Sequence, residues 1–268
     1  MEVTPVKTTI SSESHHWYKR DGSPCHEIAN ASKKGEMRGV TLRDARKLDL
    51  VPSVTTVCNI MSKPGLDLWK QKQVLMAALT LPLIDGESLD DYSARVMKDA
   101  SEQGKAAAER GTRIHGSIER YMQGLDFIPE DVAFVSSAVA ELDKITENGT
   151  AGWSVEKSFY HNGYGGKVDL HSPDGIVLDF KTKEFEPGTD AKKLAWPEQA
   201  YQLAAYRMGL KLPTARCFNV YVSVNNPGLA VTYEWPEEKI KEGEQIFLAC
   251  LKLWQLIKGY TTQDAFPG

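Results

Sequence analysis

The hydrophobic pattern of the chain changes from helical to strand-like near residue 150. Between residues 94 and 123, apolar residues recur at helical spacing, which predicts a long helix whose core-facing stripe is Ala107, Gly111, Ile114, Ile118 and Tyr121. A second helix is expected over residues 133–148. Three strand-like segments follow, at residues 153–160, 166–171 and 176–181. Because the turn signals Asn162-Gly163 and Pro173-Asp174-Gly175 separate them, these segments predict an antiparallel meander.

The last part of the chain predicts a helix, a hairpin and a closing helix. The helix is expected at residues 197–209, and Asn226-Pro227-Gly228 marks a turn between strands at 217–224 and 229–235. An amphipathic helix at 237–260 ends the pattern. The order from residue 94 onward, helix, three strands, helix and strand, favours an α/β fold with a mixed central sheet flanked by helices.

The segment before residue 94 predicts an N-terminal elaboration. Residues 16–19 and the residues after Pro24 flank an Asp21-Gly22 turn, which indicates a small β element. Ser53 follows Pro52 as a helix N-cap, and Pro64-Gly65 ends that apolar stretch before a helix containing Leu66, Trp69, Val74, Leu75 and Ala78. An acidic connection is expected over residues 83–92. We therefore divide the chain into a β element or arm at 1–50 and a core with helical insertions at 51–268.

Composition excludes several classes of protein. The chain has 268 residues, 41% of them hydrophobic and 25% charged, which is typical of a folded globular protein. No apolar run approaches the roughly 20 residues of a membrane span, so a cytoplasmic protein is expected. A net charge of −4 argues against coating nucleic acid by bulk charge, although a local groove remains compatible with it. The basic residues of segment 31–47, namely Lys33, Lys34, Arg38, Arg43, Arg46 and Lys47, support such a groove only weakly.

Candidate chemistry lies in the strand at 176–181. Asp179 and Lys181 are two residues apart, so both project from one sheet face, and a short turn brings Asp169 alongside Asp179. Two facing carboxylates repel each other unless a cation or a proton lies between them. Hard oxygen ligands suit Mg²⁺ or Mn²⁺. An isolated Asp-x-Lys is more commonly a surface salt bridge, so the interpretation depends on the accompanying motifs.

Several motifs together resemble the PD-(D/E)xK nuclease superfamily, in particular its RecB-like exonuclease branch, which includes the mitochondrial genome-maintenance exonuclease and phage exonucleases. The resemblance spans residues 50–225. In chain order its motifs are Val51-Pro52-Ser53-Val54-Thr55, Gly111-Thr112-Arg113-Ile114-His115 with Glu119, Val155-Glu156, Gly166-Lys167-Val168-Asp169, Asp179-Phe180-Lys181 and Gln202-Leu203-Ala204-Ala205-Tyr206. One departure is that Val168, not proline, precedes Asp169.

The resemblance implies a restriction-endonuclease-like core (αβββαβ) and a metal-dependent DNA exonuclease of phage or genome recombination and maintenance. In this interpretation the metal ligands are His115, Asp169, Asp179 and the Phe180 carbonyl. Lys181 orients water and stabilises the transition state, while Glu119 holds the His115 ring or the water of a second metal. Glu156 is a further candidate, or else it only pairs with Lys157 or Lys167. The expected DNA contacts are Gln202, Tyr206, Lys183, Lys192 and Lys193, although the Gln202–Tyr206 pair is also compatible with a simple helix-surface hydrogen bond.

Other interpretations predict different properties. A catalytically silent DNA-binding or structural module would keep the fold without turnover, and an endonuclease would cut without a free end. An iron–sulfur cluster is not expected, because Cys25, Cys58, Cys217 and Cys250 are too scattered to gather around one cluster. A requirement for a DNA end would come from the N-terminal residues, where Trp17 and Tyr18 would suit unpaired bases. The alternative for that segment is a cap that packs on the sheet. A recombination partner protein, if there is one, has no signature in the sequence, and a phage-encoded chain would work in the host cytoplasm.

Overall fold

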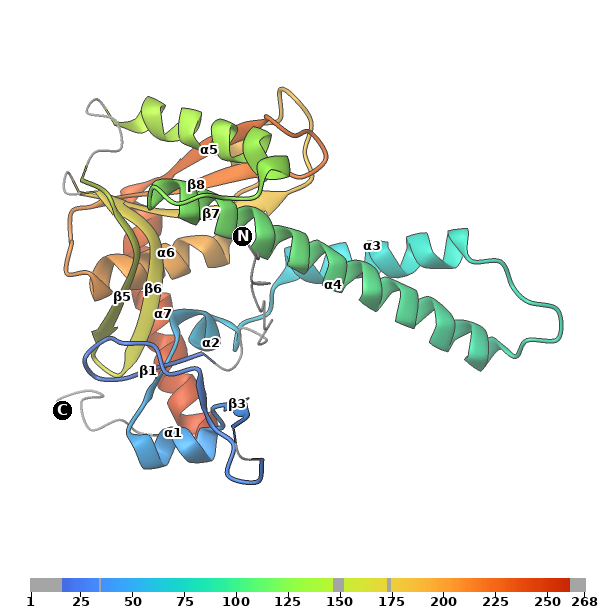
Figure 1. The fold of residues 1–268 in the computed structure, drawn as a ribbon, viewed down its shortest axis with the longest axis horizontal. Coiled ribbons are helices and arrows are strands. Elements are labelled where there is room, and N and C mark those ends of the chain that lie inside the picture. Colours follow the sequence, from blue (N-terminus) through green and yellow to red (C-terminus); the bar gives the residue numbers. More distant parts are fainter. Residues whose placement is uncertain (1–15, 34, 147–151, 173–174, 261–268) are drawn as a thin grey trace.

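The computed structural model describes residues 16–33, 35–146, 152–172 and 175–260, and a five-stranded sheet lies at its centre (Figure 1). In spatial order the strands are β5 (Ser154–His161), β6 (Tyr164–Ser172), β7 (Ile176–Lys183), β8 (Arg216–Ser223) and β9 (Ala230–Trp235). Neighbouring strands are antiparallel except β7 and β8, which are parallel and are joined through α6 (Pro197–Gly209). The predicted α/β class with a mixed, helix-flanked sheet is therefore confirmed. The predicted turn residues Pro173 and Asp174 lie outside the described residues.

The sheet has a hydrophobic core on each face, and side chains of β7 point alternately into one core and the other. Leu178 and Phe180 pack toward α4 (Leu89–Met122) and α5 (Val132–Ile145). Val177 packs on the opposite face against α6 and α7 (Glu237–Lys258). Because side chains alternate along a strand, residues 179 and 181 share the face of Val177. The acid and the base of this strand therefore lie on the side of the sheet that α6 covers.

The helices before the sheet begin at recognisable caps. Ser53 caps α2 (Val54–Cys58), since its Oγ accepts the Thr56 N–H at 3.0 Å, and this confirms the predicted N-cap. Pro64, expected to end the preceding stretch, is also the first residue of α3 (Pro64–Thr80), where its missing N–H costs nothing. Ser88 caps α4, which begins at Leu89, earlier than the predicted residue 94.

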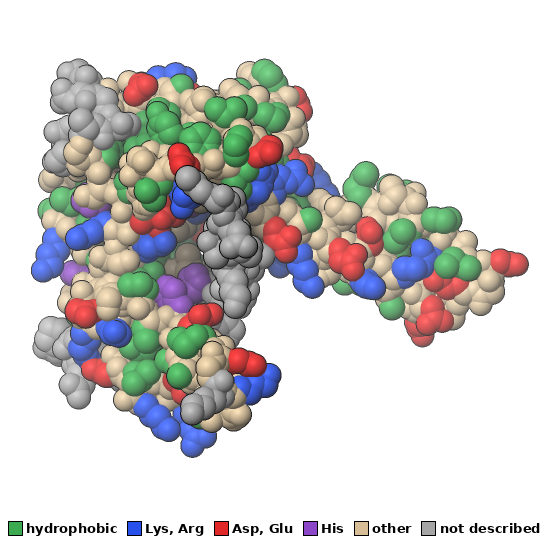
Figure 2. Space-filling model, viewed as in Figure 1, with side chains coloured by type: hydrophobic (Ala, Val, Ile, Leu, Met, Phe, Trp, Pro, Cys, Tyr) green, Lys and Arg blue, Asp and Glu red, His purple; other side chains and the backbone are tan. Residues whose placement is uncertain are grey.

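A helical hairpin made of α3 and the first half of α4 projects away from the sheet (Figure 1). A small core that includes Ala77, Val96 and Ala100 holds its two helices together. Its outer surface carries exposed large apolar side chains among acidic and basic ones (Figure 2), including Leu75, Leu79, Leu83 and Leu89. The first half of α4 therefore packs against α3 and not against the sheet.

The apolar stripe predicted for α4 is buried only where this helix packs on the sheet. Ile114 and Ile118 are fully buried there, as expected. Tyr121 is 46% exposed, so its assignment to the core was wrong. Its ring lies edge-on against Phe127, in the segment that follows the helix.

The N-terminal segment packs on the end of α7 and along β6. Strand β1 (Trp17–Tyr18) pairs with β4 (Val51–Pro52), and β2 (Glu27–Ala29) pairs with β3 (Met37–Gly39), before α1 (Leu42–Leu48). The Asp21-Gly22 turn is present, with Gly22 at φ +85°, and Tyr18 forms an antiparallel bridge to Pro24 across it. In the β1–β4 ladder, Tyr18 pairs with Val51. Lys34 of the basic run lies outside the described residues.

The two aromatic residues of β1 are not available to stack on bases. Trp17 and Tyr18 are each only 3% exposed, and Trp17 packs against Trp254 and Tyr260. The expectation that they form a platform for unpaired bases was therefore wrong. Their burial agrees with the alternative, a cap that packs on the rest of the chain.

The contact between β1 and β6 predicts the effect of Gly165→Ala on stability. An added Cβ would lie 2.5 Å from Tyr18 Cβ, so β1 would have to shift. We expect the free energy of unfolding to fall by about 1–3 kcal/mol, measured by urea denaturation. The matched control is Gly116→Ala in α4, where nothing lies within 4 Å of the added atom and a gain of up to about 1 kcal/mol is expected. An unchanged urea midpoint for Gly165→Ala would contradict this packing.

Candidate metal centre

The β5–β6 hairpin changes sheet face at Glu156 and Asp169. The strands pair at Val155–Leu170 and at Lys157–Val168, but not at the position between them, and Glu156 has a left-handed φ of +54°. Leu170 packs in the α4–α5 core, whereas Val168, two residues away, packs in the α6–α7 core. Residues two apart share a face in a regular strand, so the hairpin is bent here. A left-handed residue other than glycine costs on the order of 1–3 kcal/mol, which marks this bend as a candidate functional site.

Strands β6 and β7 also separate at this point. Their pairing extends from Ser172–Ile176 to Leu170–Leu178 and does not continue to Asp169 and Asp179. The Phe180 N–H instead donates to Asp169 Oδ2 at 2.8 Å. The carboxylate therefore replaces a backbone acceptor and is fixed between the two strands.

Helix α4 contributes His115 to the same place. Burial of the neighbouring Ile114 against the sheet directs His115 toward β6, and its Nε2 lies 2.7 Å from Asp169 Oδ2. Burial works against a charged imidazole, but the Asp169 carboxylate and more distant acids outweigh it and raise the pKa of His115 to about 9. Burial would likewise raise the pKa of Asp169, but His115 holds it below its ordinary value.

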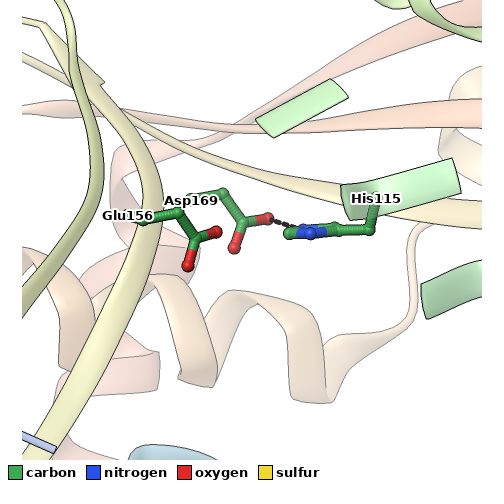
Figure 3. A group of neighbouring side chains, drawn as sticks. All are labelled: His115, Glu156 and Asp169. Atoms are coloured by element: carbon green, nitrogen blue, oxygen red, sulfur yellow. Dashed lines mark hydrogen bonds and ion pairs between the residues drawn. The ribbon is translucent and has the colours of Figure 1, made fainter. Parts of the chain in front are cut away.

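Three side chains converge where the hairpin bends (Figure 3). One ligand atom from each of His115, Glu156 and Asp169 lies within 4.8 Å of the others. Burial, assisted by the Asp169 charge, raises the pKa of Glu156, while an ion pair with Lys167 opposes the shift. The three groups come from α4, β5 and β6, so the centre exists only when these elements are packed together.

Asp179 and Lys181 form the second part of the site. Lys181 Nζ lies 3.0 Å from Asp179 Oδ1 and 2.8 Å from Oδ2. Burial, with the Asp169 charge, raises the pKa of Asp179 to about 6 despite the opposing ammonium. Gln202 Nε2 donates to Oδ1 at 3.2 Å, and Asn219 Nδ2 donates to Oδ2 at 2.8 Å. Both carboxylate oxygens are therefore engaged.

The predicted role of Glu119 as the holder of the His115 ring was wrong. Glu119 lines the same recess as His115, but its carboxylate accepts a hydrogen bond from Gln123 at 3.1 Å. The ring is held by Asp169 and lies edge-on against Phe180, whose N–H, as described, is also bonded to Asp169.

Of the two α6 residues expected to contact DNA, Tyr206 is buried and Gln202 is partly exposed. Gln202 Nε2 also donates to Tyr206 Oη at 2.7 Å, and Tyr206 is only 4% exposed. A phosphate contact by Tyr206 was therefore a wrong expectation, because its hydroxyl is buried behind Gln202. The pair belongs to the environment of Asp179.

The three predicted lysine contacts lie in two environments. Lys183 donates to the Leu194 carbonyl, its ammonium lies 3.5 Å from the Trp196 ring centroid, and burial lowers its pKa to about 7. Such an engaged, half-buried group does not match the predicted phosphate contact. Lys192 and Lys193 belong to a 3-10 turn, Ala191–Lys193, and are exposed. They remain available to a ligand.

The predicted pairing of Glu156 with Lys167 is confirmed by their ion pair. Sequence analysis missed Asn219 and Trp235 as partners of the site. Asn219 is fully buried in β8, in the otherwise apolar or aromatic run Cys217–Val222, and Trp235 donates its indole N–H to it. One polar amide in a buried strand was the available signal, because such a group needs partners.

Comparisons with known proteins do not assign this site to a family. No family model and no curated protein matches the chain. Among solved structures, the crystal structure of SSO0001 matches with a TM-score of 0.32 and 14% identity, over 69% of this chain and 85% of that chain. Likeness at this level carries no argument about fold or activity. Within the described residues, no helix has the length and apolar character needed to cross a membrane.

The convergence of the three ligand groups predicts metal-dependent stability. Mn²⁺ at a hundredfold excess over its Kd is expected to raise the free energy of unfolding by about 2.7 kcal/mol, because it binds only the folded chain. Asp169→Asn should lose most of this increase, measured by denaturation with and without Mn²⁺. Glu102→Gln, which changes an exposed acid of α4, should keep it. A wild-type chain that Mn²⁺ does not stabilise would count against a metal centre.

Proposed function

We propose that this protein is a divalent-metal-dependent deoxyribonuclease. The observation that carries the proposal is the convergence of His115, Glu156 and Asp169 beside the Asp179–Lys181 pair. Such an acid cluster with an adjacent ammonium suits phosphodiester hydrolysis, which needs an activated water and stabilisation of negative charge on the phosphorus oxygens.

The donor groups fit Mg²⁺ or Mn²⁺. Carboxylate oxygens are the ligands that these ions prefer, and the imidazole favours Mn²⁺ of the two. His115, Asp169 and Glu156 would hold the ion, with Asp179 and the Phe180 carbonyl as further ligands. When bound, the ion lowers the pKa of coordinated water and neutralises phosphate charge.

The chain's own groups would position the reactants. Lys181, held against Asp179, places an ammonium beside the acid cluster, where it orients the attacking water and steadies charge in the transition state. Asp169 cannot rotate freely, because the Phe180 N–H and His115 both hold its Oδ2. Reactive groups fixed in this way lose little entropy during the reaction.

The order of elements supports a restriction-endonuclease-like core. With α5 as an additional helix after α4, the elements α4, β5, β6, β7, α6 and β8 follow the order αβββαβ. Asp169, Asp179 and Lys181 lie on the inner strands β6 and β7. This order agrees with the motif resemblance to RecB-like exonucleases, which also favours DNA as substrate and a role in recombination or genome maintenance.

Exonuclease activity is the preferred mode of action. The N-terminal segment borders the site along β6, since Ser53 bridges Gly165 and Tyr18 packs on the same glycine. Because this segment borders one side of the site, it would restrict the directions from which a DNA strand can enter. Exposed Lys192 and Lys193, in the 3-10 turn after β7, would contact the phosphate backbone.

Lys181→Ala is expected to lower turnover by at least about 10²-fold, because the ammonium acts mainly on the transition state. Stabilisation by Mn²⁺ should persist. The measurement is single-turnover cleavage of end-labelled linear DNA with Mg²⁺. Lys192→Ala, which removes an exposed ammonium, should keep the rate constant for the bound substrate. Near-wild-type turnover in Lys181→Ala would remove this residue from the mechanism.

A linear single strand should be degraded, and a covalently closed circle of the same sequence should resist. The reason is that an exonuclease engages a free end. The assay compares both substrates by gel electrophoresis with Mg²⁺. Equal degradation would establish an endonuclease, and degradation of neither by a chain that binds Mn²⁺ would favour a catalytically silent module.

A further inference from the structure

A chain of three buried groups runs from β9 through β8 to Asp179. The Trp235 indole Nε1 donates to Asn219 Oδ1 at 2.8 Å. Asn219 Nδ2 donates to Asp179 Oδ2 at 2.8 Å and to the Asp179 carbonyl at 3.0 Å. Asn219 is the direct parallel-ladder partner of Asp179, so the amide reaches the carboxylate without leaving the sheet.

Trp235 decides which way the Asn219 amide faces. An indole N–H can only donate, so the amide atom opposite it must be the oxygen. The amide NH₂ then faces Asp179, where its two hydrogens meet two acceptors. If the amide were reversed, its NH₂ group would face the Trp235 N–H, which is also a donor. Its oxygen would face the Asp179 oxygens, which are also acceptors. The orientation is therefore fixed by the hydrogen-bond network.

This arrangement restrains Asp179 from the buried side. Lys181 reaches both of its carboxylate oxygens and Gln202 reaches Oδ1, but both of these side chains are partly exposed. Asn219 is completely buried and has a single orientation. Polar groups behind a reacting carboxylate fix its geometry, and their loss typically costs 10–100-fold in metal affinity or activity.

We propose that Asn219, oriented by Trp235, is the positioning residue that holds the Asp179 carboxylate for catalysis. The inference rests on the proposed nuclease function. Asn219 acts through Asp179 and touches neither the substrate nor the reacting atoms.

Trp235→Phe tests the proposal, because it keeps an aromatic ring in the core but removes the donor. We expect a 10–100-fold loss in kcat or in Mn²⁺ affinity, with little change in the KM for DNA. Asn219→Ala should lose at least as much. The double variant should lose no more than Asn219→Ala alone, because Trp235 acts only through the amide. Mn²⁺ affinity is measured by titration and kcat by cleavage of linear DNA with Mg²⁺.

Trp254→Phe is the matched control. It removes another buried indole, in the cluster formed with Trp17 and Tyr260, and should leave kcat and Mn²⁺ affinity unchanged. If Asn219→Ala does not fold, Trp235→Phe alone decides. Wild-type kcat and Mn²⁺ affinity in folded Trp235→Phe, or multiplicative losses in the double variant, would overturn the positioning role. A wild-type chain that neither binds Mn²⁺ nor cleaves DNA would overturn the nuclease function itself, and this inference with it.

Discussion

Three carboxylates with little exposure to solvent lie close together, and their mutual repulsion is the constraint on which the rest of the site depends. Taking a charge out of water is costly unless a partner compensates it. Each acid has its own basic partner, in the pairs Asp169–His115, Glu156–Lys167 and Asp179–Lys181. The network joins α4, the β5–β6 hairpin and β7. Electrostatic compensation and tertiary packing therefore reinforce each other.

Close packing of α4 on the sheet brings His115 near enough to Asp169 to compensate its charge. A Cβ on Gly111 would lie 2.8 Å from Thr182 Oγ1, so glycine allows the helix to approach the end of β7. Six residues further along, Ser117 Oγ donates to the fully buried Asp131 at 2.7 Å, and Arg113 pairs with the same acid. These contacts anchor α4 to the start of α5. Because His115 lies between these fixed points, its imidazole can reach Asp169.

Much of the sheet could be predicted from the sequence, because its alternation and turn signals are local. The strands, α6, the β8–β9 hairpin and the neighbouring positions of Asp179 and Lys181 followed from spacing alone. The left-handed φ of Glu156 could not be predicted, because it occurs where the β5–β6 hairpin bends between two cores, each built from residues far apart in the sequence. The burial of Tyr206 was also missed. Helical spacing predicts that Tyr206 lies near Gln202, but it does not predict which side of α6 faces the sheet. No local pattern indicated that Gly165 and Gly166 lie against aromatic side chains.

The pairing of each acid with a cation also bears on how a metal centre could form at this place. A ring nitrogen that binds a metal ion must be deprotonated, so if Nε2 of His115 binds the ion, this atom no longer carries the proton that pairs it with Asp169. His115 would give up one positive charge while the ion brings two. Lys167 and Lys181 would keep their acids compensated throughout, since neither ammonium needs to leave. The acid cluster can thus keep its geometry with and without the ion, and a site assembled in advance loses little free energy to reorganisation when it binds.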